Sequence, residues 1–189
     1  MGEKQNKKNR FSFPFPGKEL ADKELSYDPC YGKIPEEDRK RITENAWNKG
    51  VKAAEEAYAE NNGSTDFFDI CRRHGLKINE KNIDYIAGNQ RYFSDYVSGR
   101  SEVNLYLKSV QMWADENKLS LHDAENMILS HEYFHFLEVT KIGMTSREYQ
   151  VPMAIIGNVK IGKTGIRALS EIGAHAFART YWEKARAEK

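Results

Sequence analysis

This chain of 189 residues contains two histidines, His131 and His135, whose spacing of one helical turn is typical of metal-binding sites. They belong to the stretch His131-Glu132-Tyr133-Phe134-His135, which has the pattern H-E-x-x-H. On a helix, side chains at i and i+4 share one face, so both imidazoles can bind the same tetrahedral metal ion. The alternative is an ordinary helix in which these letters coincide by chance.

Zinc is the cofactor that this pattern predicts. A catalytic zinc site keeps one position open for water, lowers the pKa of that water to about 7, and needs a nearby carboxylate to accept the proton. Glu132 flanks the metal and is placed for that role. His131 and His135 share a face with apolar residues such as Ala124 and Ile128, so the ligands would emerge from a buried stripe.

A third protein ligand is expected from the stretch SEIGAHAFA, residues 170–178. Glu171 and His175 lie one turn apart there, and the small residues Ala174 and Ala178 would let this helix approach the first one closely. A carboxylate that completes a His-His-Glu set is a known catalytic arrangement, so Glu171 is the expected ligand. His175 is the alternative: it binds the metal itself, or it orients a residue that does.

The two motifs together resemble the ImmA/IrrE family of gluzincin metallopeptidases. In that family H-E-x-x-H is followed by a helix that reads approximately E-x-x-A-x-x-F-A, which Glu171, Ala174, Phe177 and Ala178 match. The upstream stretch FFDICRRHGLKI also resembles the short helix, glycine and strand that precede the family's sheet, so the resemblance extends roughly over residues 45–180. Lethal-factor-like gluzincins, with similar spacing, are the neighbouring assignment.

The resemblance implies a zinc metalloendopeptidase in which His131, His135 and Glu171 bind zinc and Glu132 is the general base. It implies a protein or peptide substrate, such as a repressor or another regulatory protein. A rival hypothesis keeps the metal fold but makes the protein a catalytically silent binding or regulatory module.

A second motif points to another function. The letters GNVKIGKT, residues 157–164, match the phosphate-binding pattern G-x-x-x-x-G-K-[ST]. A phosphate loop opens a βαβ unit of a mostly parallel sheet, but the 25 residues after Thr164 are nearly all helical in pattern. We therefore expect a glycine-punctuated hairpin or loop here, and a P-loop nucleotide-binding protein is the less favoured reading.

Peptide hydrolysis also needs a donor to the developing oxyanion. Tyr149 and Arg167 are candidates, as are Lys160 and Lys163, which otherwise form a solvated edge. Nothing in the sequence selects among them.

The elements that must position these residues indicate an α+β, zincin-like domain. A long helix is expected after Ile34, a short one near residues 66–73, an active-site helix near 121–139 that Ser120 and Asp123 cap, and a C-terminal helix that carries Glu171. Between them, LKIN, RYFSDYV and EVNLYL predict a small antiparallel sheet. EVNLYL is the expected edge strand, along which an extended substrate would bind.

The remainder of the chain sets the context. Residues 1–20 are expected to be a flexible tail, in which FSFPFP either docks in a groove or is part of the leader, and residues 21–189 form one domain. The 29 basic and 28 acidic residues nearly cancel, so neither nucleic acid nor an anionic membrane is an expected partner. Without a signal peptide or a spanning apolar run, we expect a cytoplasmic protein. The oligomeric state is not indicated.

Overall fold

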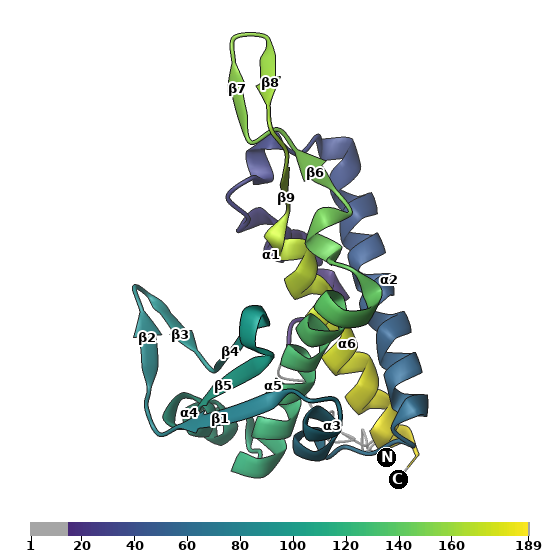
Figure 1. Ribbon diagram of the computed structural model, residues 1–189, viewed down its shortest axis with the longest axis vertical. Coiled ribbons are helices and arrows are strands. Elements are labelled where there is room, and N and C mark those ends of the chain that lie inside the picture. The colour runs from purple at the N-terminus through teal and green to yellow at the C-terminus, as the bar shows by residue number, and fades with distance from the viewer. Residues whose placement is uncertain (1–14, 189) are drawn as a thin grey trace, which may run out of the picture.

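The computed structural model describes residues 15–188, with only the backbone of Ile155, and has mixed α+β architecture (Figure 1). Residues 1–14, which include most of FSFPFP, lie outside the described residues. Within that range the chain forms six α-helices: α1 (Ala21–Ser26), α2 (Glu36–Glu60), α3 (Phe67–Arg73), α4 (Leu107–Asn117), α5 (Leu121–Leu137) and α6 (Arg167–Ala187). The strands are β1 (Lys77–Lys81), β2 (Tyr85–Ala87), β3 (Gln90–Tyr92), β4 (Ser94–Val97), β5 (Glu102–Tyr106), β6 (Gln150–Val151), β7 (Ala154–Ile156), β8 (Val159–Ile161) and β9 (Thr164–Gly165).

The long helix expected after Ile34 is confirmed as α2, which starts after Pro35 with three acidic residues in its first turn. It lies alongside α6 over much of its length (Figure 1). The two backbones come very close, because a Cβ added to Gly50 would lie 2.1 Å from the carbonyl oxygen of Gly173. The glycine pair thus fixes α6, which carries Glu171, against α2.

The three-stranded sheet has the order β1-β5-β4. Strands β4 and β5 pair antiparallel, as the sequence predicts, but β1 pairs parallel with β5, so the prediction of a wholly antiparallel sheet was wrong. The prediction that EVNLYL is an edge strand was also wrong: β5 is central, and Val103–Tyr106 are buried. Strands β1 and β4 form the edges.

The letters of the phosphate motif run from the turn of the β7–β8 hairpin through β8 to Thr164, the first residue of β9. The hairpin projects from the body of the protein (Figure 1). Gly157 has φ +58 in its turn, a conformation that suits glycine, and Ile156 pairs with Val159 across it. The expected hairpin is confirmed. It is separated from α6 by β9, so the motif does not form the strand–loop–helix junction that a phosphate loop needs.

Helix α5 is the centre of the core, and it packs against α3, α4, α6 and the sheet. Its apolar side chains join those of α3, α4, α6 and β5 in the larger core cluster, whereas α1 and the start of α2 pack on α6 in the smaller one. Helix α5, which carries His131 and His135, is therefore held on several sides. Among residues 15–188, no helix combines the length and apolar character needed to cross a bilayer.

Candidate metal centre

Helix α5 begins where the sequence predicts. The Ser120 side chain accepts a hydrogen bond from the backbone N–H of Asp123 at 3.0 Å, which caps the helix start. The α-helical hydrogen bonding continues to Leu137, and a short π-helix, Glu138–Ile142, follows. Because α5 packs against α6, the face that carries the two histidines is directed toward Glu171.

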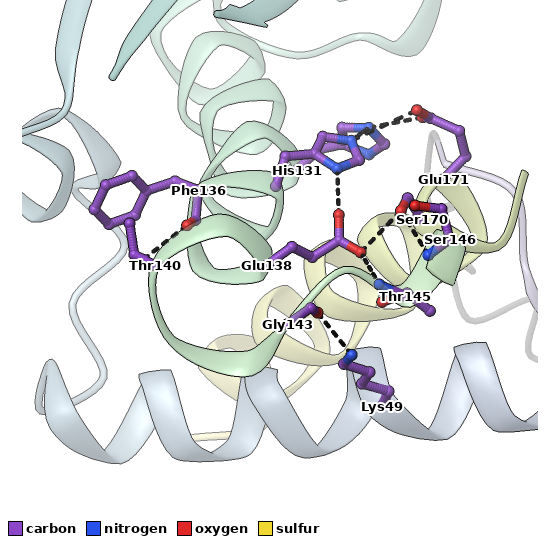
Figure 2. A network of polar contacts seen from close by, with 11 residues as sticks. Lys49, His131, Phe136, Glu138, Thr140, Gly143, Thr145, Ser146, Ser170 and Glu171 are labelled. Carbon is purple, nitrogen blue, oxygen red and sulfur yellow. Dashed lines mark hydrogen bonds and ion pairs between the residues drawn. The ribbon is translucent and has the colours of Figure 1, made fainter. Parts of the chain in front are cut away.

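His131, His135 and Glu171 form a group that could hold a metal ion, with one ligand atom from each residue within 4.8 Å of the others. The two histidine Nε2 atoms lie 3.3 Å apart. The carboxylate oxygens of Glu171 lie 3.2 Å from Nε2 of His131 and 3.6 Å from Nε2 of His135 (Figure 2). The fit to a metal is good, because two imidazole nitrogens and a carboxylate converge on one point from two helices.

The charges of this group stabilise one another. Burial disfavours the protonated imidazole of His135, but its hydrogen bonds with Glu138 and Glu171 outweigh that effect and raise its pKa well above the ordinary 6.5. Burial likewise disfavours the Glu171 carboxylate, yet its bonds with His131 and His135 hold its pKa well below the usual value. In the metal-free protein, His135 therefore carries a proton where a cation would bind.

Glu138 completes the surroundings of His135, and sequence reasoning missed it. Its Oε2 lies 3.0 Å from Nδ1 of His135, and its Oε1 accepts hydrogen bonds of 2.8 Å from the Thr145 N–H and the Ser170 hydroxyl (Figure 2). The residue as a whole is only 1% exposed. An imidazole that donates from Nδ1 to a carboxylate keeps Nε2 available for a metal. The signal in the sequence was a glutamate three residues after His135.

Ser94 is another contributor that the sequence did not reveal. Its hydroxyl donates a hydrogen bond of 2.5 Å to Oε1 of Glu132. Ser94 begins β4, so an edge strand of the sheet holds the carboxylate that the H-E-x-x-H pattern predicts as general base. Glu132 is itself buried, at 6% exposure, and this contact fixes one of its oxygens.

A cleft with a volume of about 1200 Å³ opens onto these residues. It is bordered by β4, by the segment that follows α5 and by the start of α6. The metal group and Glu132 line it, and so do Arg167 and His175. A ligand of peptide size can therefore reach the metal group and the candidate base from one side.

His175 lies beside the ligand group rather than within it. Its ring centroid is 5.0 Å from that of His131, and its nitrogens are not among the three converging ligand atoms. Burial, followed by the charge of His131, lowers the pKa of His175 to about 3, so its imidazole is neutral. This arrangement favours Glu171 over His175 as the third ligand.

The other candidate donors to an oxyanion are dispersed. Arg167 lines the cleft, but the Tyr149 hydroxyl donates to Asp38 at 2.7 Å, and Tyr149 is not among the lining residues. Lys160 and Lys163 are exposed, the first on β8 and the second just after it. Of these four candidate donors, the structure thus places only Arg167 in the cleft that holds the metal group.

Comparisons with protein-family models, with curated proteins and with solved structures found no match to this chain.

Proposed function

We propose that this protein is a zinc-dependent metallopeptidase of zincin-like fold, which hydrolyses a peptide bond in a protein or peptide substrate. The observation that carries the proposal is the convergence of His131, His135 and Glu171 in an open cleft that also holds Glu132. The resemblance of both motifs to ImmA/IrrE gluzincins supports the same reading.

Zinc is the metal that we assign to the site, because two imidazoles and one carboxylate form a donor set typical of catalytic zinc. When bound, zinc supplies a Lewis acid that makes a water molecule acidic near neutral pH and polarises a carbonyl oxygen. His131, His135 and Glu171 are the residues that would hold it.

The remaining residues orient groups and move a proton. Glu132 accepts a proton from water and passes it to the leaving amine, the role of a general base and acid. Its bond from Ser94 leaves the second carboxylate oxygen for this work. Glu138 keeps Nε2 of His135 directed at the metal through the contact at Nδ1.

The substrate is proposed to bind in extended form along β4. This strand is an edge of the sheet, and Ser94, its first residue, contacts Glu132. A peptide added to this edge would place its backbone beside the candidate base and the metal group. Strand β4 thus takes the role that the sequence assigned to EVNLYL.

Metal content and hydrolysis test the proposal together. Purified protein should hold close to one zinc per chain, and a His131→Ala, His135→Ala double variant should hold none, by elemental analysis. Peptide cleavage should require both the metal and Glu132. Zinc content that is the same in the double variant would remove the site.

A further inference from the structure

A phenylalanine from the N-terminal segment lies directly against the candidate metal centre. The ring of Phe15 stacks on His131 at a centroid distance of 5.6 Å and an interplanar angle of 18°. It also stacks on His175 at 5.9 Å and 30°, and it lies tilted against Trp113 at 5.8 Å. One aromatic side chain therefore covers a metal-binding imidazole and bridges α4, α5 and α6.

The chain that follows Phe15 is anchored outside the cleft. After the 3-10 helix Lys18–Leu20, α1 packs against α2 and α6, and Leu25 is fully buried. Asp28 accepts a hydrogen bond of 3.0 Å from the backbone N–H of Ala168, near the start of α6. Because this segment is anchored next to the cleft, Phe15 and Pro16, which precede it in the chain, lie in the wall of the cleft.

The rings around Phe15 form a surface suited to an aromatic side chain. Histidine and tryptophan rings offer flat faces, and stacked or tilted aromatic pairs at these centroid distances are favourable beyond the burial of their area. His131 makes this surface part of the metal group. A side chain that sits here is thus next to the position where a scissile bond would lie.

We propose that His131, His175 and Trp113 form an aromatic-binding subsite, that Phe15 of the same chain fills it in the resting protein, and that substrates present an aromatic side chain which displaces Phe15. The occupancy by Phe15 does not depend on catalysis, but the substrate class rests on the proposed peptidase function. Because Phe15 is tethered, it competes at an effective concentration that is about millimolar for short linkers.

The test uses the full chain, with Phe15→Ala as the variant and Tyr27→Ala as its control, because Tyr27 is an aromatic residue of the same N-terminal region that is 67% exposed. The probe is a synthetic peptide with the sequence of residues 9–16, NRFSFPFP, together with a second peptide in which alanine replaces all three phenylalanines, those of positions 11, 13 and 15. Binding is measured by calorimetry on metal-free and on zinc-treated protein, so that the result does not require cleavage.

Phe15→Ala should bind the first peptide at least about tenfold more tightly than the wild type and the Tyr27→Ala variant do, because the tethered competitor is gone. The alanine peptide should show no such gain. Equal affinity of Phe15→Ala and wild type for the first peptide would overturn the occupancy by Phe15. Equal affinity of Phe15→Ala for both peptides would overturn the aromatic subsite.

A hydrolysis arm separates this inference from the proposed function. If peptides are cleaved, Phe15→Ala should cleave an aromatic peptide faster than the wild type and should not gain on its alanine counterpart. The expected binding pattern without any cleavage would support the subsite and contradict the peptidase. Glu132-dependent cleavage without any difference between Phe15→Ala and wild type would support the peptidase and contradict the subsite.

Discussion

Glu138 Oε2 lies 3.0 Å from Nδ1 of His135, and the Glu138 side chain is shielded from solvent. Its other oxygen accepts from the Thr145 N–H and from Ser170, so the carboxylate joins the segment after α5 to α6. Such a contact fixes the imidazole tautomer that presents Nε2 to a metal. We therefore propose Glu138 as a positioning residue for the candidate metal centre, although it does not belong to the three converging ligands.

Glu138→Gln should weaken zinc binding about 10–100-fold, because His135 loses the carboxylate that orients it and raises its basicity. The zinc content at saturation should remain one per chain. Competition with a chelator of known affinity measures the change. Glu183→Gln is the matched control, since Glu183 also accepts a charged hydrogen bond but lies exposed on α6. A Glu138→Gln affinity equal to that of the control would remove the positioning role.

Zinc affinity should depend on pH through His135. The raised pKa of His135 means that the metal-free protein binds a proton there at neutral pH, and the metal must displace it. Below that raised pKa, affinity should therefore fall about tenfold for each unit by which the pH is lowered. Glu171, whose pKa is lowered, stays charged and adds no such dependence near neutrality. Calorimetry in buffers of different ionisation enthalpy should detect proton release, and an affinity that is constant between about pH 6 and pH 8 would contradict this.

Three substitutions, one in the phosphate-like motif and two in the helix that follows, distinguish a zinc site from a nucleotide site. Glu171→Ala should cut zinc affinity sharply, because two imidazoles alone form an incomplete site. His175→Ala should cause a milder loss, since its ring lies beside the ligands. Lys163→Ala should change nothing in zinc titrations. The opposite pattern, with Mg²⁺-ATP binding lost in Lys163→Ala and zinc binding indifferent to Glu171, would favour a nucleotide site.

The close approach of α2 and α6 predicts a large effect of a small substitution. Gly50→Ala places a Cβ against the backbone of Gly173, which cannot move aside without shifting a helix. We expect a net loss of about 1–3 kcal/mol in the free energy of unfolding, despite a gain of up to about 1 kcal/mol in helix propensity. Urea unfolding measures it. In Gly32→Ala, where a Cβ meets nothing within 4 Å, the stability should stay nearly unchanged.

The sequence predicted the parts of the site that lie on regular helices. The i, i+4 spacing of His131 and His135 and the position of Glu171 follow from helical periodicity, and the structure brings these three together. Helix α4 was missed because it follows β5 directly: the strand ends at Tyr106 and the helix begins at Leu107, and no glycine or proline marks the junction. Strand alternation identifies faces but not partners, so the parallel pairing of β1 with β5 was also missed.

Contacts between distant segments were beyond reach of the sequence. Ser94 and Glu132 are 38 residues apart, and a serine near the start of a strand carries no local signal of its partner. The same holds for Phe15, whose ring contacts Trp113, His131 and His175, which lie 98, 116 and 160 residues farther along the chain. Glu138 was within reach, because its spacing from His135 places it on the same side of the helix.

Cleavage of a proteome-derived peptide library by zinc-loaded protein, read by mass spectrometry, tests the proposed function most directly. Wild type and Glu132→Gln are compared after both are shown to hold one zinc per chain and to unfold at the same urea concentration. We expect the wild type to cleave and Glu132→Gln to lose cleavage by several orders of magnitude, because water loses its proton acceptor. Equal cleavage by the two proteins, or no cleavage of any peptide by the zinc-loaded wild type, would contradict the assignment of this protein as a metallopeptidase.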